Sequence, residues 1–112
     1  MINFAGKIVS ECGWAGPLLW VVTQDDFSIH LYDGRIHLDG ARVETGDDVN
    51  SRLSGKTIEK IAADRDGFRV LLAPGIELKV ERSGTETARV FKRGDLGPHC
   101  IYQNGVLSED AD

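Results

Sequence analysis

Two histidines, His30 and His37, are the residues of this sequence whose type and spacing best suit chemistry. Apolar and polar residues alternate on both sides of an Asp33-Gly34 pair, over residues 27–31 and 36–38. Asp-Gly between alternating segments predicts a two-residue β-hairpin loop, because glycine tolerates the positive φ that a type I′ turn needs. In that register His30 lies directly opposite His37 on the solvent-facing side of the hairpin. The same face is expected to carry Ser28, Tyr32, Arg35 and Asp39.

A metal ion and a protein partner are the two uses that such a histidine pair suggests. Opposed imidazoles with Asp26 or Asp39 beside them can share a zinc ion, but a structural zinc site takes four ligands. No third ligand stands at a telling spacing, so we predict no metal and no cofactor. The pair is expected instead to face solvent and hydrogen-bond to a partner, with Tyr32 adding a contact.

Other motifs that would indicate catalysis or ligand binding are incomplete. Residues 50–57 approach a phosphate-binding loop, but Asn50 stands where the first glycine is needed. The run Asp64-Arg65-Asp66-Gly67 matches half of a calcium loop and is expected to be a hairpin turn. His99 and Cys100 are adjacent, so on a strand they point to opposite faces and cannot act as base and nucleophile. The sequence therefore predicts a protein that is not an enzyme.

The charge of the chain is acidic overall and uneven along its length. Thirteen Lys and Arg oppose eighteen Asp and Glu, which gives a net charge of −5. Residues 24–50 carry seven acidic and two basic side chains, residues 51–93 carry six acidic and ten basic, and residues 94–112 carry four acidic and no basic ones. Such a chain is repelled by nucleic acid and anionic lipid and attracted to a basic protein. The acidic residues expected to meet that partner are Asp25, Asp26, Asp33, Asp39, Asp47 and Asp48.

The tryptophans and cysteines are expected in distinct settings. Trp20 begins an apolar run and is predicted to pack in the core. Trp14 stands among loop-forming residues, where it either anchors an interface or covers the open end of a β core. Cys12 and Cys100 form no metal-binding or redox motif and are predicted to be buried free thiols.

Turn residues recur roughly every 8 to 12 positions, which predicts a mainly β fold. We expect a single-domain antiparallel meander, sandwich or small barrel with at most one short helix, at residues 47–53 and ended by Gly55. A second hairpin is expected at residues 68–80, with a three-residue loop that pairs Leu72 with Ile76. Residues 57–63 fit a helical stripe or a strand, and strand is preferred. The other strands are expected at residues 2–9, 18–23, 88–91, 100–102 and, after an Asn104-Gly105 turn, 106–107.

The organisation expected is one β-rich domain over residues 1–107 followed by an acidic tail at 108–112. The longest apolar stretch, residues 17–22, is far shorter than the roughly 18 to 20 residues that span a bilayer. The first residues do not form a secretory signal. The expected compartment is the cytoplasm, with no membrane partner.

One resemblance is carried by Leu53-x-Gly55-x-x-Ile58-x-x-Ile61, followed by Gly67-Phe68-x-Val70-x-Leu72-x-x-Gly75-x-x-Leu78-x-Val80. This run resembles the β-rich pattern of small uncharacterised bacterial domains. The whole chain resembles, more loosely, acidic immunity proteins of bacterial toxin systems. The resemblance implies a cytoplasmic inhibitor that is not an enzyme and that occupies a basic toxin, often a nuclease. It carries over no binding residues.

Three hypotheses about function follow from the sequence. The first is a protein-binding inhibitor of a basic partner, such as a toxin, that uses the acidic hairpin face, with Trp14 as an anchor. The second is a small enzyme or a ligand-binding or metal-binding barrel whose pocket uses His30, His37 and Tyr102. The third is a homo-oligomer that pairs through an exposed β edge.

Overall fold

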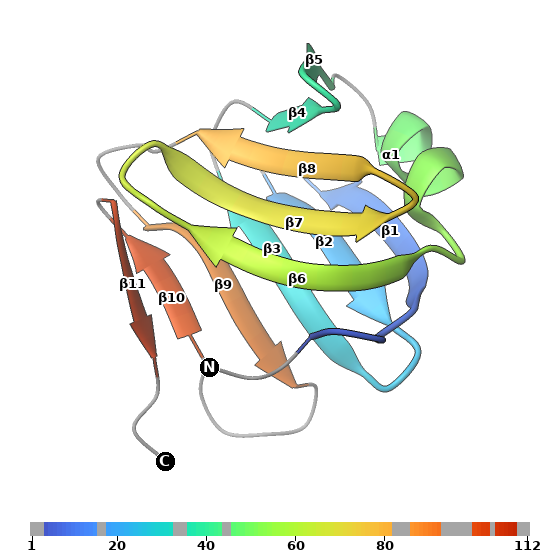
Figure 1. The fold of residues 1–112 in the computed structure, drawn as a ribbon, viewed down its shortest axis with the longest axis horizontal. Coiled ribbons are helices and arrows are strands. Elements are labelled where there is room, and N and C mark those ends of the chain that lie inside the picture. Colours follow the sequence, from blue (N-terminus) through green and yellow to red (C-terminus); the bar gives the residue numbers. More distant parts are fainter. Residues whose placement is uncertain are drawn as a thin grey trace.

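The computed structural model describes residues 4–15, 18–32, 36–43, 46–81, 86–92, 100–103 and 105–109. They form two antiparallel sheets that face each other, with one short helix beside them (Figure 1). The mainly β fold predicted from the sequence is therefore confirmed, and of the three architectures expected it is the sandwich. Among these residues no helix has the length and the apolar character needed to cross a membrane.

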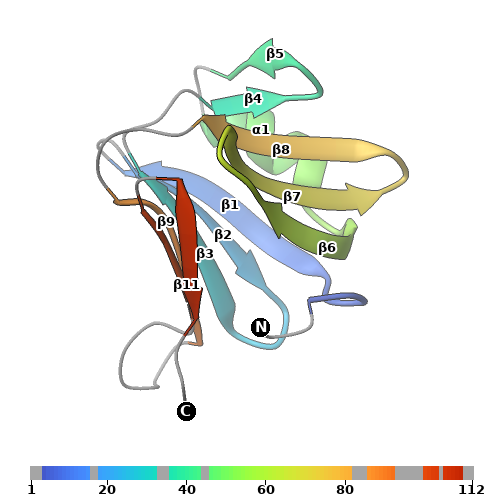
Figure 2. The ribbon, with the colours of Figure 1, turned by 60° about the vertical axis from the view of Figure 1, so that its left-hand side comes forward.

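The larger sheet has six strands in the order β1-β2-β3-β9-β10-β11. Their bounds are β1 Val9–Ala15, β2 Leu18–Thr23, β3 Phe27–Tyr32, β9 Glu86–Lys92, β10 Cys100–Gln103 and β11 Val106–Glu109. The smaller sheet has five strands in the order β5-β4-β8-β7-β6. Their bounds are β4 Ile36–Leu38, β5 Ala41–Arg42, β6 Thr57–Ala63, β7 Gly67–Ala73 and β8 Ile76–Glu81, and the helix α1 spans Gly46–Leu53. Figure 2 shows the two sheets as separate layers, with α1 beside the smaller sheet and β1.

The core lies between the two sheets because apolar residues alternate along the strands and point to one face of each sheet. The larger sheet contributes buried side chains such as Leu19, Val21 and Ile29, and the smaller one Val70 and Leu78. The helix adds Val49 and Leu53, which are fully buried. Each such side chain stabilises the fold by about 1.5–3 kcal/mol relative to exposure.

The predicted hairpin between β3 and β4 is wrong. Strand β3 is hydrogen-bonded to β2 on one side and to β9 on the other, whereas β4 pairs with β5 and β8 in the opposite sheet. Alternation of apolar and polar residues shows only which face of a strand points to the core. Two successive strands have the same alternating pattern whether they pair within one sheet or face each other across the core. The turn residues 33–35, on which the prediction relied, lie outside the described part of the chain.

The hairpin expected at residues 68–80 has the predicted register, and the neighbouring strands lie where they were expected. Strands β7 and β8 pair Leu72 with Ile76 and Val70 with Leu78, and Gly75 in the loop has a φ of 70°. Residues 57–63 form strand β6, as preferred over a helix, and pair with β7. The turn that follows β6 is held by Asp64, whose Oδ1 accepts the backbone N–H of Asp66 at 2.8 Å. Strands β10 and β11 also form the expected hairpin.

The two ends of the described chain differ in part from the prediction. The first long strand begins at Val9, whereas a strand was expected over residues 2–9. Residues 6–8 instead contact the edge of β6, where Ile58 donates its N–H to the Lys7 carbonyl at 2.7 Å and Ile8 bridges Thr57. At the other end β11 runs to Glu109, so it includes residues 108 and 109 of the predicted tail, and residues 110–112 lie outside the described part.

Candidate functional site

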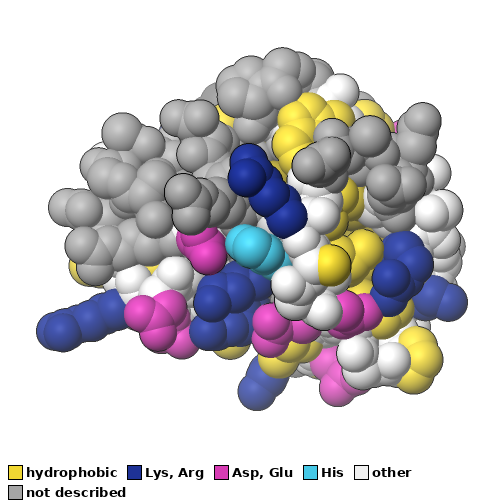
Figure 3. All heavy atoms as spheres, turned by 90° about the horizontal axis from the view of Figure 1, so that it is seen from above, with side chains coloured by type: hydrophobic (Ala, Val, Ile, Leu, Met, Phe, Trp, Pro, Cys, Tyr) yellow, Lys and Arg dark blue, Asp and Glu magenta, His cyan; other side chains and the backbone are white. Residues whose placement is uncertain are grey.

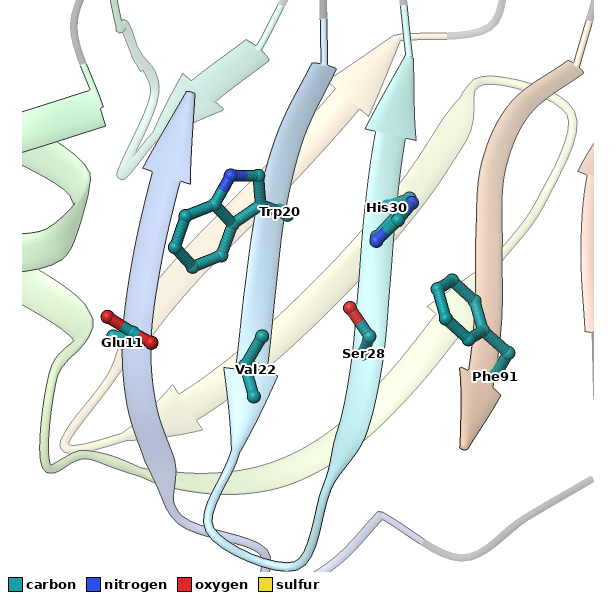
Figure 4. A pocket seen from close by; sticks show the side chains of 6 residues that line it. All are labelled: Glu11, Trp20, Val22, Ser28, His30 and Phe91. Atoms are coloured by element: carbon teal, nitrogen blue, oxygen red, sulfur yellow. The ribbon is translucent and has the colours of Figure 1, made fainter. Parts of the chain in front are cut away.

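The outer face of the six-stranded sheet, which points away from the core, carries a depression of about 360 Å³. Four adjacent strands supply its walls, as Figure 4 shows. The lining residues are Glu11 of β1, Trp20 and Val22 of β2, Ser28 and His30 of β3, and Phe91 of β9. We call this feature the outer depression.

Strand register brings these residues together in two rows across the sheet. In one row, Val22 lies opposite Ser28, and Ser28 lies opposite Phe91. In the other row, Trp20 lies opposite His30. Side chains two residues apart on a strand share a face, so both rows point outward while the residues between them point into the core.

Trp20 forms one wall of the depression, and its predicted place in the core is wrong. The inward positions of β2 belong to Leu19 and Val21, which are buried, so the period of two turns Trp20 outward. Its indole lies over Gly13 of β1, where an added Cβ would be 2.1 Å from indole atom Cζ2. A glycine is thus required opposite Trp20 for the ring to lie flat against the sheet.

His30 is the polar centre of the depression. Its Nδ1 lies 3.3 Å from the hydroxyl of Tyr32, and its ring meets Phe91 edge to face with centroids 4.6 Å apart. Burial lowers the pKa of His30 below its ordinary value of 6.5, and the positive charge of Arg89 lowers that pKa further. The imidazole is therefore neutral at pH 7, with one nitrogen able to donate and the other able to accept a hydrogen bond.

Two oxygen-bearing side chains complete the lining. Ser28 is only 3% exposed although it points to the outer face, because its neighbours there enclose it. Glu11 is exposed and has no ion pair with any described residue. The depression thus combines the aromatic side chains Trp20 and Phe91 with the Glu11 carboxylate at its β1 side, and Arg89 lies next to His30 on β9.

The predicted acidic residues that the structure describes are separated and largely neutralised. Asp25, in the β2–β3 turn, forms an ion pair with Lys7, which together with the Thr23 hydroxyl holds the pKa of Asp25 below its usual range. Asp39, next to the smaller sheet, accepts the backbone N–H of Glu77 at 2.9 Å and forms an ion pair with Arg52 at 2.5 Å. These two bonds, in that order of effect, lower the pKa of Asp39.

The remaining predicted acidic residues add no described cluster. Asp26 is exposed, with a φ of 68°. Asp33 and the side chains of Asp47 and Asp48 lie outside the described part of the chain. Figure 3 shows a face on which acidic and basic side chains are interspersed, without a region of one sign among the coloured atoms.

His37 and Trp14 do not lie with His30. His37 is in β4 of the opposite sheet, where its Nε2 is 3.5 Å from Glu81 and has no hydrogen bond with a described residue. The predicted His30–His37 pair therefore does not exist, because the two strands belong to different sheets. Trp14 is partly buried and packs against the core, which favours its reading as a cover over the core's end.

The cysteines are both buried and free, as the sequence predicted. Burial, with a smaller contribution from the charge of Glu11, raises the pKa of the Cys12 thiol to about 12. At neutral pH this thiol is protonated and is a poor nucleophile.

Of the predicted site residues, the structure brings His30 and Tyr32 together, and to these it adds Glu11, Trp20, Val22, Ser28 and Phe91. The alternation of residues 28, 30 and 32 was visible in the sequence. Phe91 alternates with Val90 in the same way, but nothing local indicated that β9 pairs with β3.

No protein-family profile matches this chain, and no curated protein or solved structure matches it.

Proposed function

We propose that this protein is a non-enzymatic binding protein that inhibits or regulates a basic protein partner, and that it binds this partner through the outer depression. The observation that carries the proposal is the arrangement of Trp20, His30 and Phe91 around a concave site with Glu11 at its side. A toxin of the kind that immunity proteins neutralise is the partner class that the sequence resemblance suggests.

The aromatic side chains support binding to a protein surface. Trp, Tyr and Arg are the residues most often found where a few side chains supply most of the binding free energy. Here Trp20 lies over Gly13, and the His30 ring lies between Phe91 and Tyr32. Rings held in this way lose little conformational freedom on binding.

The charge of the site supports a basic partner. A Lys or Arg side chain that enters the depression would meet the aromatic rings and the Glu11 carboxylate, and both attract a cation. The neutral state of His30 leaves Arg89 as the positive charge beside it, and Arg89 lies on β9, whereas Glu11 lies on β1 at the opposite side of the depression. The net charge of −5 adds long-range attraction that speeds association at low salt.

The outer depression is a different binding site from the acidic hairpin that the sequence suggested. Asp25 and Asp39 already have basic partners within the molecule, so their charges are partly cancelled at contact distance. A partner's cation would have to displace Lys7 or Arg52 to reach them. Glu11 has no such competitor among the described residues.

A small organic ligand is the second candidate for the same site. The volume of about 360 Å³ falls in the range of small-molecule pockets, and Ser28 and His30 would supply its hydrogen bonds. This ligand would be bound without the salt-dependent association rate that a basic protein requires.

Panning a phage-displayed library of random peptides against the protein tests the proposal. We expect the enriched peptides to carry Lys or Arg beside apolar residues, and their binding to weaken with salt. Removing one ring with Phe91→Ala should weaken a selected peptide by about tenfold, because a ring central to an interface contributes on the order of 1.4 kcal/mol or more.

Glu59→Ala is the matched control, since Glu59 is exposed on β6 of the other sheet. Fluorescence anisotropy of a labelled peptide measures each affinity. Enrichment of acidic peptides, or equal affinities for the two variants, would contradict the proposal. Enrichment of no peptide, together with saturable binding of a small molecule that shifts the Trp20 fluorescence, would favour the second candidate.

A further inference from the structure

The free edge of β11 is a second feature with which another chain can interact. A sandwich of two open sheets has four edge strands, which here are β1 and β11 in one sheet and β5 and β6 in the other. The backbone N–H and C=O groups of an edge strand point sideways out of the sheet and can pair with a further strand. Which edges are already occupied therefore decides where a partner strand can join.

The edge of β1 is closed by α1 and the residues that follow it. Asn50 Oδ1 accepts the backbone N–H of Cys12 at 2.8 Å, and the Ser54 hydroxyl donates to the Ser10 carbonyl at 3.1 Å. These contacts satisfy groups that a further strand would need. A partner strand cannot pair there without displacing the helix.

The two edges of the smaller sheet are also unsuitable. On β6, Ile58 donates its N–H to the Lys7 carbonyl and its own carbonyl accepts the N–H of Gly6 at 2.9 Å, so the N-terminal segment occupies the start of that edge, at Thr57 and Ile58. A register shift between Ile58 and Lys60 then interrupts the strand, and such an irregularity disfavours pairing with a further strand. Strand β5 is only two residues long, Ala41–Arg42. Two residues offer too few hydrogen bonds to hold an extended segment.

No strand in the described part of the chain pairs with the outer edge of β11, which is four residues long. Val106 pairs with Gln103 across a two-residue turn, and in such a hairpin this closing pair is hydrogen-bonded. Bonded and non-bonded pairs then alternate, so the backbone groups of Leu107 and Glu109 point away from β10. No hydrogen bond from a described residue reaches this side of β11, and Figure 1 shows β11 as the last strand of the sheet, next to β10.

The side chains along this edge suit an apolar and basic partner. Val106 is 62% exposed and is the exposed large hydrophobic residue among those described, while Leu107 packs against the core from the other face. A neighbouring strand would cover both. The chain carries a net charge of −5, so a strand with basic residues is attracted to it.

We infer that β11 accepts an extended segment of a partner protein, with alternating apolar and basic side chains, as a seventh strand of the larger sheet. This is a second contact beyond the outer depression, and it rests on the proposed function only for the basic character of the partner. A second copy of this chain fits less well, because it brings the same net charge of −5 and the same acidic segment.

The test uses the full chain, labelled with ¹⁵N, and a capped hexapeptide of alternating lysine and valine as the probe. We expect hydrogen exchange of the Leu107 and Glu109 amides to slow about tenfold at saturating peptide, because these N–H groups become hydrogen-bonded. Glu109→Pro should abolish this protection at Leu107, since it removes an outward N–H and leaves the pairing with β10 intact. Glu109→Gln should keep the protection at Leu107. An unchanged melting temperature of both variants checks that they are folded.

Four results would overturn the inference. Absence of protection at Leu107 with the lysine–valine peptide shows that the edge binds no such strand. Equal protection by a glutamate–valine hexapeptide refutes the basic partner. Protection that rises with protein concentration in the absence of peptide, with a dimer seen by sedimentation, assigns the edge to a second copy. Loss of protection in Phe91→Ala would place the peptide in the outer depression, so the two proposals can fail separately.

Discussion

His30 shows how one residue can be set up for binding by its neighbours on the sheet. Phe91 covers one side of its ring, Tyr32 lies within hydrogen-bond distance of Nδ1, and Arg89 is opposite on β9. Phe91 withdraws the ring from water and the positive charge of Arg89 repels a proton, so both disfavour the charged form of His30. The same imidazole at the end of a loop would be partly protonated near neutral pH.

Because of this environment, the stability of the protein should fall below pH 6.5 through His30. The pKa of His30 is lower in the folded chain than its value of 6.5 in the unfolded chain. The unfolded state therefore binds more protons as the pH falls from 6.5 to the folded pKa, and stability is lost over that window. Above pH 6.5 the ionisation of His30 does not change the free energy of unfolding. The carboxylates of Asp25 and Asp39 reduce stability only below pH 3.8, which is their ordinary pKa.

Thermal melts at pH 7.5 and 5.5 check this prediction. The drop in melting temperature between the two should be smaller in His30→Gln than in the wild-type chain, and His37→Gln is the matched histidine control. Ring-proton titration by NMR should give a pKa for His30 below 6.5 that rises partway in Arg89→Ala, because burial is the larger cause. An unchanged pH response in His30→Gln would show that the ring is not withdrawn from water.

At the scale of elements, α1 serves as a cover for the edge of β1. The helix is short, with eight residues, and its stability must come from packing, because isolated helices of this length do not persist in water. Val49 and Leu53 supply that packing, and Asn50 supplies the hydrogen bond to Cys12. A helix and an edge strand thus stabilise each other.

Asn50→Ala should destabilise the fold by about 1–3 kcal/mol, because it leaves the Cys12 N–H without its acceptor at a partly buried site. Alanine is the better helix former, and this preference offsets a few tenths of a kcal/mol of the loss. Urea denaturation measures the difference. Asn50→Asp keeps an oxygen at the same place and should lose less, and an alanine variant as stable as the wild-type chain would show that this bond has no role at the β1 edge.

At the scale of the whole molecule, contacts on both sides hold the two sheets together around the core. On one side the segment around Ile8 bridges β6 of the smaller sheet. On the other, the fully buried Tyr102 of β10 donates its hydroxyl to the Asp64 carbonyl in the β6–β7 turn at 2.5 Å. Its ring also packs against Phe68 of β7, with centroids 6.0 Å apart.

Tyr102→Phe keeps this ring packing and removes the hydroxyl, so it isolates the polar link between the sheets. We expect a loss of about 1 kcal/mol in the free energy of unfolding, because the Asp64 carbonyl loses a donor in a partly buried setting. Tyr32→Phe is the control, since its hydroxyl lies on the outer face. Equal losses in the two variants by urea denaturation would mean that the Tyr102 hydroxyl does not join the sheets.

Local chemistry explains which parts of the fold could be predicted. The register of β7 and β8 followed from the alternation of Val70, Leu72, Ile76 and Leu78 around a glycine with positive φ. The end of α1 followed from Gly55, whose φ is 81°. In each case the residues that determine the structure are neighbours in the chain, so their preferences can be read directly from the sequence.

The site depended on pairings that no local pattern specifies. Ile29 lies opposite Val90, and the same pairing of β3 with β9 places Phe91 beside His30. The apolar run from Leu18 to Val22 gave no sign that Trp20 faces outward, because every position in it is apolar and the period of two is hidden. His30 and His37 were assigned to one hairpin for the same reason, since alternation does not distinguish a sheet neighbour from a strand across the core.

By itself the sequence determined a β-rich chain with a net charge of −5, its main turns and its one short helix, because these depend on side chains and backbone preferences within a few residues. Only the tertiary structure decided which strands are neighbours, which acidic groups are neutralised by Lys7 and Arg52, and which edge stays open. These properties arise from contacts between distant segments, and many pairings bury the same apolar faces until packing of the whole core selects one.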